Sequence, residues 1–278
     1  MADLKQLPFL LKLIDDESPM VRERVWDELE SFGPSLECEL DRLADPPDDT
    51  LRFLLRDLIL NNRKTIFRKN WLSWLFLHDD KVKLEHAFSL LSDYMNGESY
   101  PVKLIDQLDE LAADYNAIHE EADVTTLARF LFETKGLSGA DTDYYNPYNN
   151  DLVYVIQTRN GLPITLACIY MLVGRRLGLH IEGCNMPGHF FARVIINNRI
   201  YLVDCFNNGQ FFHSDEFHPF LTSESRRLRN VISSPPDAET VFRRVIMNLV
   251  RAYQHEEDKE ECQFFIDRLN ELNNLRKS

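Results

Sequence analysis

The sequence predicts an α+β fold, in which one buried helix packs on a small antiparallel sheet between mainly helical flanks. Apolar residues recur at helical spacing through the first third of the chain and again at its C-terminal end. Residues 162–177 are almost all apolar, with Pro163 near the start and Gly178 just beyond the end. Proline suits a first helical turn and glycine suits a helix C-terminus, so this segment is predicted to be a buried helix. Short apolar runs typical of strands follow it.

Two apolar stripes at helical spacing predict a helical hairpin in the N-terminal region. They consist of Leu7, Leu10, Leu11 and Ile14, and of Val21, Val25, Leu29 and Phe32. The turn between them carries Asp16 and Arg22, a pattern that resembles a HEAT repeat, although no second copy follows at a fixed period. Further helices are expected at 50–61, 64–76, 81–95, 104–117 and 125–135.

Strands are expected at 179–186, 189–196 and 199–206, with Asn197 and Asn198 as a tight hairpin turn, because asparagine tolerates positive φ. This turn pairs Ile196 with Arg199. The same register makes His189 and Asp204 diagonal neighbours on one face of the sheet. A carboxylate beside an imidazole fixes its tautomer and stabilises its cation, so the pair matches two members of a Cys–His–Asp triad.

The regions around this core divide the chain into four expected segments. Residues 137–150 are rich in Gly, Ser, Asp, Asn and Tyr and are predicted to form a long irregular loop, often a functional feature. Two apolar stripes near the C-terminus predict a helical hairpin that resembles a TPR unit. The expected segments are a HEAT-like region at 1–62, a helical lead-in at 63–124, the core at 125–232 and the TPR-like hairpin at 233–278.

Composition limits the classes of function. The chain has 278 residues, 44% of them apolar and 27% charged, as in an ordinary globular protein. A net charge of −14 argues against a nucleic-acid partner. The basic runs at 52–69 and 226–229 are interpreted as solvated surface, with a local anionic partner as the alternative. No apolar run reaches the ~18 residues typical of a membrane helix, so no membrane partner is expected.

Five cysteines without regular spacing argue against a disulfide framework or zinc site and favour a reducing compartment. The N-terminal residues lack the pattern of a secretory leader, so a cytoplasmic location is expected. Metal-ligand side chains cluster at His213, Asp215, Glu216 and His218, but a lone cluster in a loop is more typical of solvated surface than of a metal site. No Gly-rich phosphate loop is present, and no cofactor or metal is expected.

Several ordered motifs resemble the transglutaminase-like superfamily, and most closely its SirB branch. They are Arg159–Leu166, Gly174–Leu179, Pro187–Phe190 and Val203-Asp204, with Leu131-Phe132 and Tyr144–Asn149 upstream. The resemblance covers roughly residues 127–206. It implies a core helix packed on an antiparallel sheet, with helical flanks that are often TPR-like at the C-terminus.

The resemblance also locates a missing nucleophile. Active members carry a cysteine at the start of the core helix, where the helix N-terminus lowers the thiol pKa. Counting back from Leu166-Ala167 places this cysteine at position 163, which is Pro163 here. Four side chains are weighed as substitutes: Cys168 and Cys205, expected to face away from the site, Cys184, on a separate strand, and Thr165, a helix cap or a weak nucleophile.

The candidate site therefore has a vestigial catalytic part and a binding part. His189 and Asp204 are the vestigial catalytic candidates, with packing as the alternative role. The candidate binding residues are Asn149, Arg159, Asn160, Gly161, Thr165 and Gly188. Alternatively, the loop residues among them satisfy backbone carbonyls, and Gly188 only permits a tight entry into a strand.

Two functions remain open at this point. The first is a catalytically inactive scaffold or regulatory module that binds a protein or peptide, which Pro163 favours. The second is a cysteine-protease-like or transglutaminase-like hydrolase or acyltransferase with a non-standard nucleophile, which His189 and Asp204 favour. The sequence identifies neither the partner nor the oligomeric state.

Overall fold

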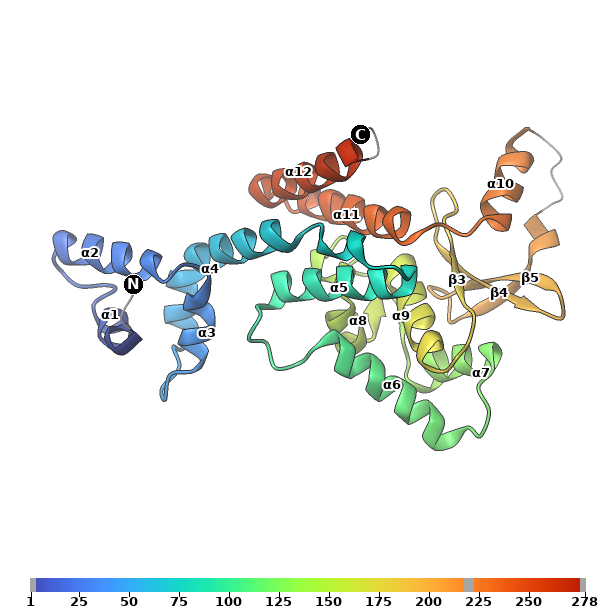
Figure 1. The fold of residues 1–278 in the computed structure, drawn as a ribbon, viewed down its shortest axis with the longest axis horizontal. Helices are drawn as coiled ribbons and strands as arrows, with labels where there is room; N and C mark the ends of the chain where they lie inside the picture. The colour runs from blue at the N-terminus through green and yellow to red at the C-terminus, as the bar shows by residue number, and fades with distance from the viewer. Residues whose placement is uncertain (1–3, 218–222, 276–278) are drawn as a thin grey trace. The chain divides into compact units, whose positions relative to one another are not determined.

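The structure is a computed structural model that describes residues 4–217 and 223–275 (Figure 1). The chain forms two compact units. One contains the chain up to Leu72 together with Asp93–Pro101, and the other contains Ser73–Ser92 and the chain from Val102 onward. Within the described residues, no helix has both the length and the apolar character needed to cross a bilayer.

The first unit is helical. Its helices are α1 (Leu7–Lys12), α2 (Pro19–Ser31), α3 (Leu36–Asp41) and α4 (Asp49–Asn70), and it also includes the last residues of α5. The two predicted stripes lie in or against one apolar core, where Leu29 is fully buried. This confirms the inward faces of the predicted hairpin, while its HEAT-like character stays a prediction.

The predicted break near residue 62 is wrong, because α4 runs unbroken from Asp49 to Asn70. No glycine or proline interrupts it there, and Arg63 is fixed from two sides. Its guanidinium pairs with Glu37 of α3, with Nε 2.9 Å from Oε2, and donates to the Met95 carbonyl at 2.7 Å. The predicted second helix ends early: α4 stops at Asn70, a turn follows at Trp71 and Leu72, and Ser73–Phe76 form a short 3-10 turn. Helix α3 was not predicted.

The second unit contains the remaining helices. They are α5 (Asp80–Asn96, up to Ser92), α6 (Leu104–Ile118), α7 (Val124–Arg129), α8 (Leu152–Thr158), α9 (Pro163–Arg176), α10 (Ser223–Ser233), α11 (Ala238–His255) and α12 (Lys259–Leu275). Helix α7 continues into a π-helical turn, Phe130–Thr134. The predicted helices at 81–95, 104–117 and 125–135 are therefore confirmed, whereas α8 and α10 were not predicted.

Helix α9 is the centre of this unit (Figure 1). Every residue from Pro163 to Gly174 is buried, as the apolar run predicted. Helices α6, α7, α8 and α11 and strands β3 and β4 all contact it. At its C-terminal end, Arg176 pairs with Glu85 of α5 and Asp109 of α6. The start of α9 is consequently held in one place relative to the sheet.

The main sheet has four antiparallel strands in the order β3 (Glu182–Cys184), β4 (Phe191–Ile196), β5 (Arg199–Asp204) and β6 (Gln210–His213). Ile196 pairs with Arg199 across a turn of Asn197 (φ 51°) and Asn198 (φ 61°), which confirms the predicted register. The strands are shorter than predicted. The boundary at His189 is wrong, since β4 begins at Phe191, and β6 was not predicted.

The segment predicted as an irregular loop at 137–150 is partly ordered. β1 (Ser138–Gly139) pairs in parallel with β2 (Asn160–Gly161), and Pro147–Asn150 form a 3-10 turn that contacts α11. The prediction of a long irregular loop was therefore wrong near both ends of this segment.

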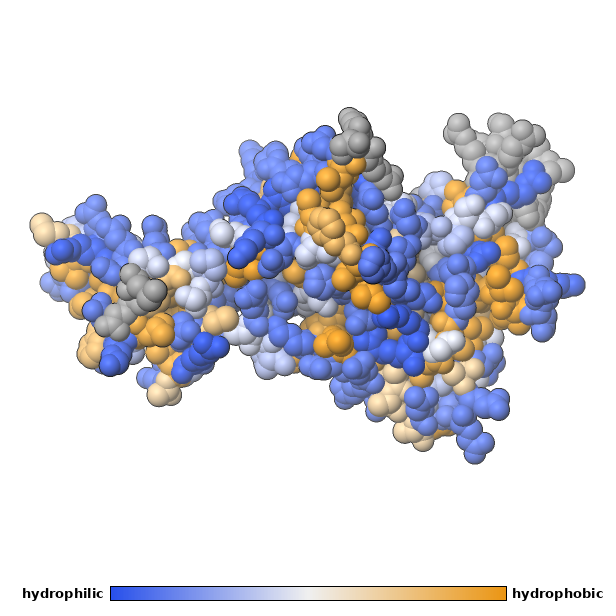
Figure 2. Space-filling model, in the orientation of Figure 1, coloured by the Kyte–Doolittle hydropathy of each residue, from blue (hydrophilic) through white to orange (hydrophobic). Residues whose placement is uncertain are grey.

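The C-terminal helices form the expected hairpin, with α11 packed along α12. Phe242 of α11 contacts Trp74 and Phe88, with ring centroids 5.5 Å apart in both pairs. Figure 2 shows a narrow apolar strip over this hairpin. The combination of one central helix, a small antiparallel sheet and helical flanks confirms the predicted α+β fold, while the division into four segments stays a prediction.

Candidate functional site

His189 and Asp204 form a direct hydrogen bond, as the hairpin register predicted. His189 Nε2 lies 2.9 Å from Asp204 Oδ1. Asp204 is the last residue of β5, and His189 reaches it from the segment just before β4. The imidazole is 27% exposed and the carboxylate only 9%. Because Nε2–H donates to Asp204, the lone pair of His189 is placed on Nδ1.

Asp204 is held ionised by more than His189. The backbone N–H groups of Phe206 and Asn207 donate to Oδ1 at 3.2 Å, and Asn207 Nδ2 donates to Oδ2 at 2.8 Å. Burial opposes ionisation, but the hydrogen bonds from His189 and Asn207 outweigh it and lower the pKa of Asp204 below its usual value. The carboxylate is therefore fixed in place and charged at neutral pH.

Aromatic rings surround His189. The Phe191 ring lies 4.5 Å from the imidazole and the Phe206 ring 6.3 Å, measured between centroids. Phe206 in turn contacts Tyr144, at 6.3 Å. The Phe206 ring packs against Gly139 of β1, where an added Cβ would lie 2.6 Å from the ring. Only glycine fits this close approach, so β1 helps to position the wall of the site.

Pro163 is the first residue of α9, the position from which the resemblance implies a lost cysteine. Thr165 caps this helix start from within. Its Oγ1 accepts from the Leu162 N–H at 2.9 Å and donates to the Leu162 carbonyl at 3.1 Å, and the residue is fully buried. Pro163 and Gly188, the neighbour of His189, line one cavity of about 400 Å³. The helix start and the His189 segment thus border the same space.

The cysteines of the core are buried. Cys168, Cys184 and Cys205 have no exposed surface. Burial raises the pKa of the Cys168 and Cys205 thiols well above the usual range and that of Cys184 to about 11. A thiol that is both buried and protonated is a poor nucleophile, so none of the three has the properties of a replacement.

Most of the candidate binding residues support the local backbone. Buried Asn149 donates to the carbonyls of Asp143 and Tyr144, at 2.6 and 3.3 Å. Arg159 ends α8 with a φ of 63°, and its carbonyl accepts from Ser138 at 2.8 Å.

Asn160 and Gly161 form β2, and Asn160 also donates to the Thr158 carbonyl at 2.9 Å. An added Cβ on Gly161 would meet Val155 at 2.6 Å. Gly188 has a φ of 80° and lines the cavity. Of the candidate binding residues, Gly188 is therefore the one with surface in that cavity.

The His213 cluster forms a local turn. His213 Nδ1 accepts from the Asp215 N–H at 3.2 Å, and Glu216 accepts from the His213 N–H at 2.7 Å. His218 lies outside the described residues. Within the described ranges, no group of three or more His, Cys, Asp or Glu side chains is arranged to hold a metal ion.

Sequence reasoning missed several residues at the site. Asn207, which fixes Asp204, follows the predicted strand by one position and carries no motif. Arg244 and Arg251 of α11 line the cavity beside Pro163 although they lie far away in the sequence. Their helical stripe predicts which face of α11 is buried but not which loop the opposite face adjoins.

The transglutaminase-like superfamily model matches residues 102–247, more than half of the chain. The chain belongs to the transglutaminase-like superfamily. The match includes His189, Asp204 and the start of α9 and extends into α11, beyond the region that carried the resemblance in the sequence. The superfamily assignment is thus confirmed, whereas the assignment to the SirB branch stays a prediction.

Bacterial and animal proteins are similar to parts of this chain. A UPF0162 protein of Xylella fastidiosa is 33% identical over 151 residues, which are 52% of this chain and 53% of that protein. A UPF0162 protein of Pseudomonas aeruginosa is 30% identical over 134 residues, 44% of this chain and 49% of that protein. F-box only protein 21 of Mus musculus is 36% identical over 63 residues, 23% of this chain and 10% of that protein.

The chain spans about half the length of the bacterial relatives that it matches. No solved structure matches it.

Proposed function

We propose that this chain is a SirB-type member of the superfamily that binds a protein or peptide segment in its former catalytic cleft without covalent catalysis. The observation that carries the proposal is the helix start. Pro163 occupies the first position of α9, where it supplies no nucleophile, and the hydroxyl of Thr165 is buried and bonded to Leu162. Covalent acyl transfer needs an activated nucleophile that reaches the substrate.

The buried thiols support the same proposal. A substrate carbonyl has no path to Cys168, Cys184 or Cys205 without opening the core, because none of them has exposed surface. In this proposal, the His189–Asp204 hydrogen bond holds the segment before β4 against the end of β5 and shapes one wall of the cleft.

A second candidate function is hydrolysis by activated water. One observation favours it: the His189–Asp204 pair is intact, and the imidazole is partly exposed with its Nδ1 lone pair available. General-base assistance alone is typically worth ~10²–10⁴-fold. That is well below the ~10⁶–10¹⁷-fold that enzymes typically achieve. This candidate therefore predicts slow turnover that depends on His189 and on no cysteine.

Amide hydrolysis and transamidation by the full chain separate the two candidates. The wild-type protein, the five single Cys→Ala variants and His189→Ala are assayed on a mixture of peptide substrates. We expect no turnover above background in any of them. Hydrolysis that survives every Cys→Ala change but is lost in His189→Ala would establish the second candidate instead.

Binding is tested with the cleft residue Tyr144. Cross-linking with mass spectrometry identifies peptide segments that bind the wild-type chain. The affinity of the same segments is then measured for Tyr144→Ala. The control is Ile105→Ala, which removes an exposed apolar side chain that does not line the cavity. Binding that is weakened by Tyr144→Ala alone supports a ligand in the cleft. Binding by Tyr144→Ala that equals that of wild type and of Ile105→Ala excludes the cleft as the binding site.

A further inference from the structure

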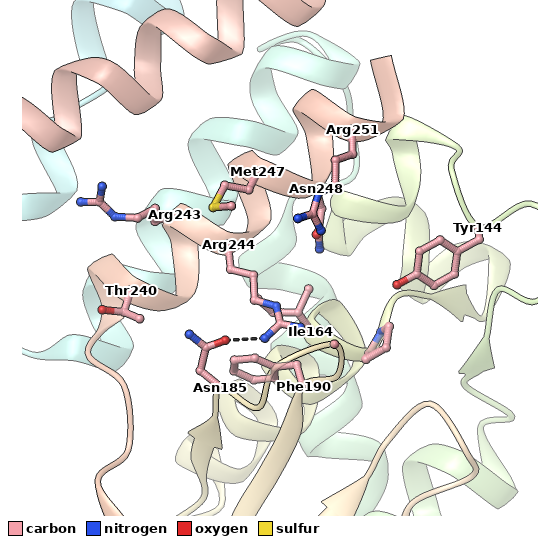
Figure 3. A pocket seen from close by; sticks show the side chains of 12 residues that line it. Tyr144, Ile164, Asn185, Phe190, Thr240, Arg243, Arg244, Met247, Asn248 and Arg251 are labelled. Atoms are coloured by element: carbon pink, nitrogen blue, oxygen red, sulfur yellow. Dashed lines mark hydrogen bonds between the residues drawn. The ribbon is translucent and has the colours of Figure 1, made fainter. Parts of the chain in front are cut away.

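A cavity beside the His189–Asp204 pair is lined by helix α11. Its volume is about 400 Å³, within the ~300–1,000 Å³ common for ligand sites. Three parts of the second unit meet there: the start of α9, the segment before β4, and the face of α11 that carries Arg244 and Arg251. Figure 3 shows Arg244 extending from α11 to Asn185 and Phe190. The cavity is thus polar on its α11 side and apolar at Phe190 and Ile164.

The arginines on this wall carry positive charge that carboxylates do not neutralise. Arg244 donates to Asn185 and to the Met186 carbonyl, and its guanidinium lies 5.6 Å from the centroid of the Phe190 ring. Both acceptors are uncharged. Within the part of the chain that the structure describes, the exposed Arg251 makes no ion pair or side-chain hydrogen bond. This positive charge stands out in a chain of net charge −14.

Arg243, on the same helix, is a useful contrast. It pairs with Glu239 and donates to Asn273, and in Figure 3 it points away from Arg244. Arg244 lies close enough to Arg251 to be affected by its charge. Burial, together with the charge of Arg251, lowers the pKa of Arg244, although the nearby Tyr144 acts in the opposite direction. The charge of an anion in the cavity would offset both unfavourable effects.

The rim of the cavity favours a peptide over a small free anion. Tyr144 and Met247 line the cavity, and each is 42% exposed. Tyrosine, methionine and arginine are among the residue types enriched at protein interfaces. A free phosphate ion would contact the arginines and leave these apolar surfaces unused.

We propose that this cavity binds an acidic peptide segment of a partner protein, with a carboxylate side chain between Arg244 and Arg251 and an adjacent apolar side chain against Tyr144 and Met247. The planar guanidinium fork matches a carboxylate through two parallel hydrogen bonds. The segment lies in the cleft bordered by Pro163 and Gly188, so this inference rests on the proposed function and specifies the chemistry of its ligand.

Selection from a random peptide-display library against the full chain tests this inference. We expect selected peptides to be enriched in Asp and Glu next to an apolar residue. The strongest binder is then synthesised and titrated against Arg251→Gln, which removes a side chain without partners in the described structure. We expect its affinity to fall about tenfold or more, the usual effect of one lost charge-assisted hydrogen bond. Arg199→Gln, an equal charge change at the exposed hairpin turn, should leave the affinity unchanged.

Arg244→Gln provides a second measurement. Its fold is checked by circular dichroism, because Arg244 also donates a hydrogen bond to the Met186 carbonyl. Selected peptides without acidic residues, no selected peptide at all, or equal affinity for Arg251→Gln and wild type would overturn the inference. Inorganic phosphate that binds through Arg244 and Arg251 while no peptide is selected would also overturn it, in favour of a small-anion site. Cleavage of a selected acidic peptide that depends on His189 would overturn the proposed function but leave the arginine assignment intact.

Discussion

His189 and Asp204, fifteen residues apart in the sequence, are joined by a 2.9 Å hydrogen bond at the open end of the β4–β5 hairpin. The Asp204 carboxylate accepts three further hydrogen bonds, all from Phe206 and Asn207. The pair is therefore anchored by the backbone that follows β5, and His189 is its more exposed member. This arrangement has consequences for stability as well as for chemistry.

Asp204→Asn should lower stability in a pH-dependent manner. The pKa of Asp204 is lowered in the folded protein, so its charge contributes stability above the unfolded pKa of about 3.9, and this contribution is lost as the pH falls through the folded pKa. We expect wild type to exceed the variant by about 1–3 kcal/mol at neutral pH. The difference should stay constant down to about pH 5 and shrink below about pH 4. Urea unfolding at several pH values measures this.

The exposed Asp215→Asn provides the control for that experiment, because its carboxylate is 73% exposed and its removal should change stability little. A difference between wild type and Asp204→Asn that grows as the pH falls would contradict the assignment of Asp204 as a stabilising carboxylate.

Pro163→Cys should create a reactive thiol at the start of α9. A helix N-terminus lowers the pKa of a thiol, and position 163 lines the cavity that also contains Gly188, the neighbour of His189. We expect iodoacetamide to alkylate the new cysteine, which borders this cavity, faster than the fully buried Cys168, and more slowly when His189→Ala is added. Mass spectrometry follows the reaction.

Pro163→Ser serves as the folding control for this substitution, since it removes the proline but adds no thiol. Labelling of Pro163→Cys that is no faster than that of the buried Cys168, in a variant with wild-type circular dichroism, would show that the start of α9 is closed to solvent.

Thr165→Val should destabilise the protein, whereas Thr165→Ser should not. Valine keeps the shape of threonine but leaves the buried Leu162 N–H without its 2.9 Å acceptor. The expected loss is about 1–3 kcal/mol, the usual effect of a lost helix cap or a buried orphan donor. Thermal unfolding compares the three proteins. Equal melting temperatures for valine and threonine would mean that water replaces the hydroxyl.

Gly139→Ala should disturb the ring that flanks His189. An added Cβ would lie 2.6 Å from the Phe206 ring, and forcing extra atoms into packed space typically costs about 1–3 kcal/mol. Because the φ of Gly139 is not positive, the effect is steric alone. Phe206→Leu makes room, so the double variant should be less unstable than the sum of the single changes. Additive losses in denaturant unfolding would rule out this contact as the cause.

Local patterns predicted much of the core. The apolar run at 162–177 identified the central helix, and the Asn197-Asn198 turn set the register that brings His189 to Asp204. Both depend on neighbours in the sequence: helical periodicity needs a few adjacent residues, and a two-residue turn fixes all pairs of its hairpin. The same logic failed where a long-range contact decides a boundary, as in α4, whose continuity past residue 62 accompanies the anchoring of Arg63 by Glu37.

The sequence by itself determined that α9 is buried, that proline stands at its first turn and that the β4–β5 hairpin has one register. Only the tertiary structure decided which distant groups complete the cleft. Arg244 and Arg251 reach it because α11 packs against α9, and Tyr144 reaches it because Gly139 admits the Phe206 ring that Tyr144 contacts. Such contacts depend on the packing of whole elements, since the periodicity of a helix says which face is buried but not what lies opposite its other face.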